Sequence, residues 1–122
     1  MLKFLLLLAV LGAGIAGYQY FSTPLPVSRL SDEQISTLAA TVKAKEVTIY
    51  TTSTCPYCAQ AMAWLKQNGF AFNECNMSNS SACERAFLQM GGNGTPFLVI
   101  KRQGKTYYMR DGFDSAEFLG AL

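Results

Sequence analysis

Residues 46–67 read Glu-Val-Thr-Ile-Tyr-Thr-Thr-Ser-Thr-Cys-Pro-Tyr-Cys-Ala-Gln-Ala-Met-Ala-Trp-Leu-Lys-Gln, and this stretch largely determines the expected architecture. Its first six residues are rich in β-branched and aromatic side chains, as is typical of a strand. Its last part consists mostly of good helix formers, and Gly69 stands where a helix end commonly has glycine. Pro56 then falls at the first helical position, where its missing N–H costs nothing. The stretch therefore predicts a strand, a turn and a helix that begins at a Cys-x-x-Cys pair.

The position of Cys55 at this helix start has a chemical consequence. Unpaired backbone N–H groups and the positive end of the helix dipole face its sulfur. Both features stabilise a thiolate, which is the nucleophilic form of cysteine. We expect Cys55 to attack a substrate disulfide, Cys58 to resolve the mixed disulfide, and Tyr57 to shape the substrate edge. A structural disulfide is the alternative for this pair.

Composition limits the other functional classes. The chain has 122 residues, half of them apolar, which suits one domain with a single core. The formal net charge is +2 and the charges are scattered, so no nucleic-acid partner is expected. The chain contains no histidine, which excludes Ser–His–Asp triads and His-ligated metal sites.

The N-terminal segment differs from the rest of the chain. Residues 4–18 are uncharged and strongly apolar, so residues 1–21 are expected to form a signal peptide or a transmembrane anchor. The absence of an Ala-x-Ala cleavage site favours an anchor that contacts the membrane through residues 2–21. Residues 22–30 contain two prolines and are expected to form a linker to a domain at residues 31–122. Either version places the domain on the periplasmic or extracytoplasmic side.

Capping boxes, apolar periodicity and turn residues predict the remaining elements. The strand–helix–strand unit predicts a right-handed parallel crossover, and a later hairpin adds antiparallel strands. The result is an α/β fold with a mixed four-stranded sheet and helices on both faces. The expected helices lie at residues 31–44, 56–67, 81–90 and from 114 onward, and the expected strands at residues 46–51, 70–75, 96–100 and 106–110.

Three local motifs on these elements resemble the glutaredoxins of the thioredoxin superfamily. Residues 54–58 have the form of the family's active site. Residues 94–96 precede a strand, where the superfamily places a cis-proline next to the dithiol. Residues 112–115 resemble the glycine-plus-acidic motif at the last helix. The resemblance covers roughly residues 31–122 and implies a thioredoxin-like (glutaredoxin) fold with thiol–disulfide oxidoreductase activity.

The resemblance also implies a substrate site. Thr95, beside a cis Pro96, would present its backbone to an extended substrate, and the N-terminus of the last helix would hold the γ-glutamyl part of glutathione. The partners would be disulfide-containing proteins or glutathione mixed disulfides, with glutathione as a possible co-substrate and no bound cofactor. Residues 95–96 could instead simply begin an edge strand, and Gly112 with Asp114 could be an ordinary helix start. The residues implied are Pro56, Tyr57, Thr95, Pro96, Gly112, Phe113, Asp114 and Ser115.

Two positions depart from the family pattern. Thr52 stands where the family commonly has a lysine, and Ala59 stands where a basic residue often follows the second cysteine. Each missing cation removes a charge-assisted contact worth about 1.5–3 kcal/mol. These departures weaken the expectation of glutathione binding and leave thiol–disulfide exchange intact. An envelope protein-disulfide oxidoreductase independent of glutathione is therefore the alternative function.

Cys75 and Cys83 lie outside the family pattern. A short polar loop joins them, and an exported compartment permits disulfides, so a structural bridge is the leading interpretation. A second redox pair relaying electrons to the first, or free thiols, are the alternatives. A function of another class is a membrane-tethered metal or iron–sulfur binding module. The Pro-Tyr pair between Cys55 and Cys58 disfavours one shared site, so no metal ligand is predicted.

Overall fold

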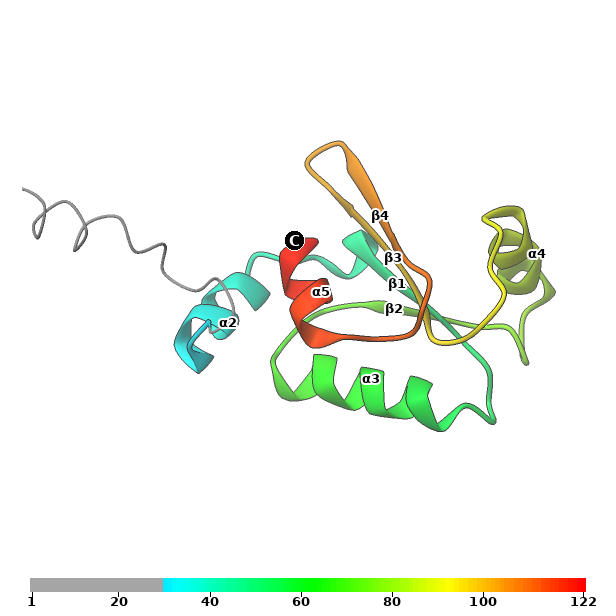
Figure 1. Ribbon diagram of the computed structural model, residues 1–122, viewed down its shortest axis with the longest axis horizontal. Coiled ribbons are helices and arrows are strands. Elements are labelled where there is room, and N and C mark those ends of the chain that lie inside the picture. Colours follow the sequence, from blue (N-terminus) through cyan, green and yellow to red (C-terminus); the bar gives the residue numbers. More distant parts are fainter. Residues whose placement is uncertain (1–29) are drawn as a thin grey trace, which may run out of the picture.

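The computed structural model describes residues 30–122 (Figure 1). The predicted signal or membrane segment and nearly all of the predicted linker lie outside the described residues. Within residues 30–122, no helix is both long and apolar enough to cross a membrane.

The described chain alternates helices and strands in the order expected from the sequence. A single turn of 3₁₀ helix, η1, precedes the first strand. The elements are α2 (Asp32–Ala39), η1 (Ala44–Glu46), β1 (Val47–Thr51), α3 (Pro56–Gln67), β2 (Asn73–Asn76), α4 (Ser81–Gln89), β3 (Phe97–Arg102), β4 (Lys105–Met109) and α5 (Ser115–Gly120).

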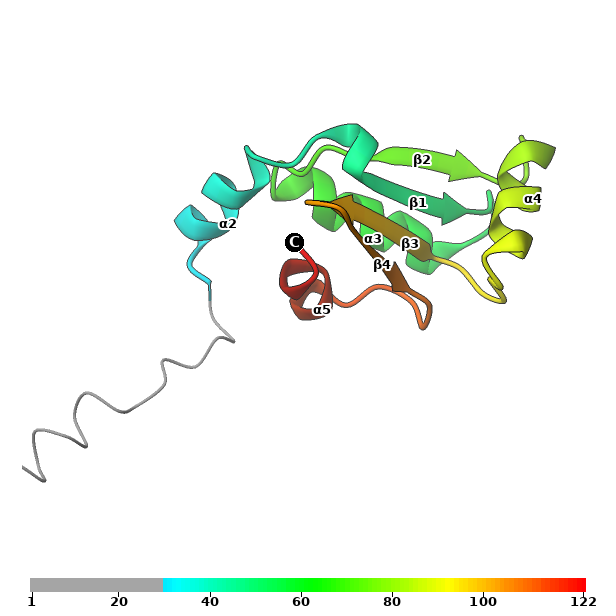
Figure 2. The same ribbon diagram turned by 90° about the horizontal axis from the view of Figure 1, so that it is seen from above.

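The four strands form one mixed sheet in the order β2-β1-β3-β4 (Figure 2). β1 runs parallel to β2 and antiparallel to β3, and β3 and β4 form the hairpin. The predicted four-stranded mixed sheet flanked by helices is confirmed. Because β1 is an inner strand, the loop that follows it, residues 52–55, leaves from the middle of the sheet and leads directly into α3.

Helices cover the two faces of the sheet unequally. Val47 and Ile49 point to one face, where residues of α2, α3 and α5 complete the larger core. Tyr50, Phe97 and Val99 point to the other face, where α4 covers a smaller core. In both ribbon views α2 and α4 lie at opposite ends of the molecule (Figures 1 and 2).

The first helix is shorter than the sequence predicts. α2 ends at Ala39 instead of near Ala44. The N–H of Lys43 donates to the Glu46 carboxylate at 2.8 Å, and this contact begins η1. Val42 between the two helices is buried, so the chain turns inward there instead of continuing the helix.

The second strand starts later than predicted, at Asn73 instead of Phe70. Gly69 adopts a φ of +78°, and the N–H groups of Gly69 and Phe70 donate to the carbonyls of Lys66 and Leu65. This is a Schellman closure of α3. It turns the Phe70 ring into the core, where it stacks on Trp64 with 5.7 Å between ring centroids. Phe70 therefore closes a helix and packs the core instead of pairing in the sheet.

Candidate active site

The dithiol lies at the start of α3, as the sequence predicts. Cys55 is the N-cap residue, Pro56 begins the helix, and the Cys55 sulfur accepts the Cys58 N–H at 3.1 Å. The two cysteines form a disulfide. Cys58 is only 1% exposed, whereas Cys55 is half-buried. The helix start therefore leaves one sulfur open to attack and shields the other.

Thr95 approaches the dithiol from the opposite side. The Thr95–Pro96 peptide bond is cis, and Pro96 is buried at the start of β3. The Thr95 hydroxyl donates to the Cys55 sulfur at 3.4 Å, joining residues 40 positions apart in sequence. A hydroxyl donor at this position stabilises negative charge on that sulfur.

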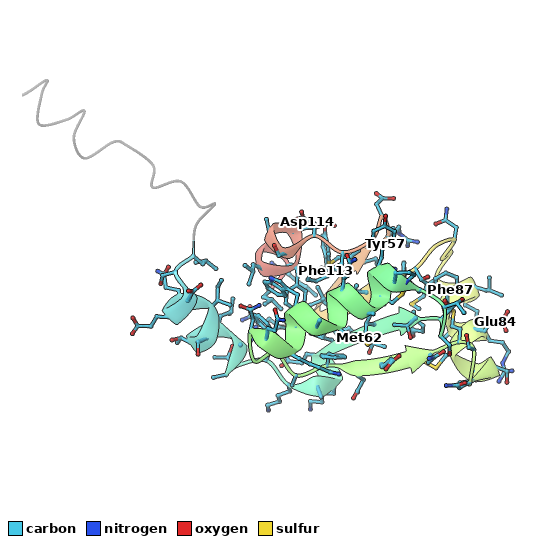
Figure 3. The ribbon with its side chains drawn as sticks, turned by 90° about the horizontal axis from the view of Figure 1, so that it is seen from below. Tyr57, Met62, Glu84, Phe87, Phe113 and Asp114 are labelled. Atoms are coloured by element: carbon cyan, nitrogen blue, oxygen red, sulfur yellow. A yellow bond between two sulfur atoms is a disulfide. The ribbon has the colours of Figure 1, made fainter. Side chains whose placement is uncertain are left out.

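A groove of about 760 Å³ lies beside this pair. It brings together most of the substrate residues implied by the resemblance: Tyr57, Thr95, Pro96 and residues 112–115. Tyr57, at the start of α3, is 71% exposed. Phe113, which precedes α5, lies beside a later part of α3 (Figure 3). Pro56 is not among the lining residues.

The α5 end of the groove is a capped helix start. Asp114 is the N-cap, and its carboxylate accepts the Glu117 N–H at 2.8 Å. Gly112 has a φ of +95°, which favours glycine and lets the chain turn into the cap. The Phe113 ring packs on Trp64 of α3, with centroids 5.4 Å apart. One carboxylate oxygen of Asp114 thus caps α5, and the residue also lines the groove.

A polar contact fastens α5 to the hairpin. The Tyr107 hydroxyl on β4 donates to the Glu117 carboxylate at 2.8 Å. This hydrogen bond to the carboxylate raises the pKa of Tyr107 above its ordinary value of 10.0. The contact holds the N-terminus of α5, and with it the end of the groove, against the sheet.

The groove carries little positive charge. Thr52 lines a separate small hollow with Ser78 and Glu84, and Ala59 is an exposed residue of α3 that does not line the groove. Arg110 is the one basic residue among the groove's lining residues. Arg110 was not predicted as a groove residue: it is exposed directly after β4, and no spacing in the sequence brings it to the groove.

The second cysteine pair supports the loop behind the dithiol. A disulfide joins Cys75 on β2 to Cys83 in the first turn of α4. The loop between them contacts the active-site loop at Ser53, whose N–H donates to the Ser78 hydroxyl at 3.0 Å. The Asn76 amide also donates to the Ser53 hydroxyl at 3.3 Å. The bridge therefore closes a loop that holds the residues just before Cys55.

We expect the double variant Cys75→Ser, Cys83→Ser to lower the free energy of unfolding by about 2–3 kcal/mol. Without the bridge the unfolded chain gains conformational entropy, which lowers stability. In the folded protein the loop that holds Ser53 through Ser78 is also less restrained. Urea unfolding with and without a reductant measures the effect. A variant as stable as the parent protein would show that the bridge contributes nothing to the fold.

Metal ligands do not gather in the described part of the chain. Within residues 30–122, no three Cys, Asp or Glu side chains lie close enough together to hold a metal ion. All four cysteines are paired in the two disulfides.

Comparison with known proteins agrees with this geometry. The family model described as Glutaredoxin matches residues 47–104. The crystal structure of the thioredoxin-like protein BC3987 superposes with a TM-score of 0.51 at 26% identity, covering 62% of this chain and 99% of that one. A mutant of the same protein matches with a TM-score of 0.51 at 24% identity, covering 62% of this chain and 96% of the other. No curated protein matches the chain.

A mixed sheet of this order, with a Cys-x-x-Cys pair at a helix start and a cis-proline beside it, defines a protein of the thioredoxin superfamily. Within that superfamily, residues 47–104 are similar to the glutaredoxins, whose family model they match. This membership supports thiol–disulfide oxidoreductase chemistry in general.

Proposed function

We propose that this protein is a thiol–disulfide oxidoreductase in which Cys55 is the nucleophile and Cys58 the resolving cysteine. One observation carries the proposal: the half-buried Cys55 sulfur accepts the Cys58 N–H at the start of α3 and the Thr95 hydroxyl from across the site. Both donors favour the thiolate over the thiol. The burial of Cys58 keeps it from competing for substrate.

The reaction has two exchange steps. The Cys55 thiolate attacks one sulfur of a substrate disulfide, and the second substrate sulfur leaves as a thiolate. The Cys58 thiolate then attacks the Cys55 sulfur of the mixed disulfide and displaces the substrate's remaining thiolate. The protein loses two electrons and forms the Cys55–Cys58 disulfide, and the substrate gains two electrons. With no histidine in the chain, the protons move between the thiols and water.

The groove supports a substrate that lies along the cis-proline. Thr95 and Pro96 form one wall, and Tyr57 stands beside the dithiol. An extended segment of a protein could pair with the Thr95 backbone as an added strand would. A disulfide held in such a segment would meet Cys55 first, because Cys55 is the more exposed of the pair.

The charge of the groove favours a protein disulfide over glutathione as substrate. Asp111 and Asp114 outnumber the single cation Arg110 among its lining residues. Glutathione carries two carboxylates and one ammonium group, so this groove offers it too few cationic partners. The second candidate is therefore a glutathione-independent protein-disulfide oxidoreductase. Such a protein would act on the extracytoplasmic side of the membrane, and residues 2–21 would tether it there or direct its export.

Restoring the missing cations tests this candidate. Thr52 and Ala59 do not line the groove, but they stand where the family commonly has basic residues, so we expect the variant Thr52→Lys, Ala59→Lys to reduce glutathione mixed disulfides at least about tenfold faster than the parent protein if its long lysine side chains pair with the glutathione carboxylates. Reduction of a protein disulfide such as that of insulin, with dithiothreitol as electron donor, serves as the control for intact exchange chemistry. Robust glutathione-dependent turnover by the parent protein would instead favour an ordinary glutaredoxin. Inactivity of the parent protein on both substrates would contradict the function itself.

A further inference from the structure

Arg110 is held in a defined position by contacts from two other segments. Its guanidinium lies over the rings of Phe97 and Tyr108, 5.6 and 5.1 Å from their centroids. Its Nη1 donates to the carbonyl of Met90 at 2.8 Å, at the C-terminal end of α4. Two aromatic rings and a helix-end carbonyl hold the guanidinium in place before any substrate arrives.

The charge of Arg110 has no carboxylate partner in the described part of the chain. The ion pair found within residues 30–122 joins Arg102 to Glu46, far along the hairpin from Arg110. The hydrogen bonds of Arg110 use only Nη1, so its other nitrogens have no acceptor among the described residues. A guanidinium with free donors binds a carboxylate through two parallel hydrogen bonds.

This cation lines the same groove as Thr95, the residue that contacts the reacting sulfur. Arg110 contacts Phe97, which directly follows Pro96, and Thr95 before it contacts Cys55. Of the two lining carboxylates, Asp114 caps α5 at the other part of the groove, whereas Asp111 directly follows Arg110. A substrate lying in the groove would therefore meet the positive charge of Arg110 in the part shared with Thr95 and Pro96, and the negative charge of Asp114 at the start of α5.

We propose that Arg110 forms a subsite for an acidic side chain next to the attacked cysteine of a protein disulfide. The inference rests on the proposed function and adds the substrate class: disulfides flanked by Asp or Glu. The chemistry of exchange is unchanged. Arg110 binds the flanking carboxylate and so raises the rate of the first attack by Cys55, without touching the sulfurs.

Two matched peptide disulfides test the subsite. Each is a symmetric dimer of a short peptide with one cysteine, which is flanked by Glu in one dimer and by Gln in the other. The protein, with Cys55 and Cys58 reduced and Cys75 and Cys83 still bridged, is mixed with each dimer, and the rate constant for its oxidation is measured by mass spectrometry of alkylated samples. In this single-turnover reaction the protein's dithiol supplies both electrons, and each dimer gives two peptide thiols.

We expect the parent protein to react about three to ten times faster with the Glu dimer than with the Gln dimer. Arg110→Gln should bring this ratio close to one, and Arg110→Lys should keep part of it because the charge remains. Asp111→Asn is the matched control: it removes a neighbouring charge of opposite sign and should keep or raise the ratio. The preference of the parent protein should also shrink as salt is added.

The outcomes separate the subsite from the proposed function. Equal rates for both dimers in the parent protein, or an unchanged ratio in Arg110→Gln, would overturn the subsite while the oxidoreductase stands. An Arg110→Gln effect seen only with glutathione disulfide would also overturn it, because the carboxylate recognised would then belong to glutathione. A parent protein that reacts with neither dimer would remove the function on which the subsite rests. If Arg110 only supported the end of α4 through the Met90 carbonyl, Arg110→Gln would slow the reactions with both dimers alike and leave their ratio unchanged.

Discussion

Cys55→Ser is expected to lower turnover on a protein disulfide by at least about a thousandfold, because a serine hydroxyl is not ionised at neutral pH and does not attack disulfides. The structure leaves no substitute nearby. Cys58 is 1% exposed, and the other two cysteines are joined to each other on β2 and α4. The measurement is reduction of insulin by dithiothreitol in the presence of the purified variant.

Cys58→Ser is the matched control for this loss. It keeps the nucleophile, so the first exchange should proceed while the mixed disulfide is no longer resolved by the protein. We expect one equivalent of substrate to be bound quickly and steady turnover to fall. Retention of more than a tenth of the parent turnover by Cys55→Ser would show that another group attacks the substrate.

Phe118→Ala is expected to lower the free energy of unfolding by about 3–5 kcal/mol. The Phe118 side chain is fully buried, and its ring centroid lies 5.0 Å from that of Phe70 and 5.9 Å from that of Trp64. Its removal leaves a cavity between α5 and α3, the two helices that bound the groove. Urea unfolding followed by the fluorescence of the single tryptophan measures the change.

Leu88→Ala provides the comparison on the surface. Leu88 on α4 is 61% exposed, so its truncation should change stability by less than about 0.5 kcal/mol. A loss below about 1 kcal/mol in Phe118→Ala would mean that α5 is not packed as the structure shows it. In that case the α5 end of the groove would lose its structural basis as well.

The elements with strong local signals could be predicted from the sequence. The β-branched run of β1, the proline at the start of α3 and the capping residues at Ser31 and Asp114 each act within a few positions. The start of β2 could not be read in this way. Phe70 looks like a strand residue, but its position is decided by the closure of α3 and by packing on Trp64. Tertiary packing outweighed β-propensity there.

The residues of the candidate site also differ in whether local sequence or tertiary packing decides their position. The role of Cys55 follows from its place at a helix start, which is a local property. The approach of Thr95 joins distant segments, and only the family resemblance pointed to it. Arg110 was missed because its position depends on Met90 and Phe97, contacts that no spacing in the sequence reveals. A cation becomes part of a site only once the fold has fixed where it lies.

Peptide mapping of a trapped intermediate tests the central claim most directly. The variant Cys58→Ser is reduced, mixed with a protein disulfide, quenched by alkylation and digested, and the linked peptides are identified by mass spectrometry. The proposed mechanism predicts a mixed disulfide on Cys55 alone, with Cys75 and Cys83 still joined to each other. Substrate attached to Cys75 or Cys83, or no trapped adduct at all, would contradict the assignment of Cys55 as the nucleophile.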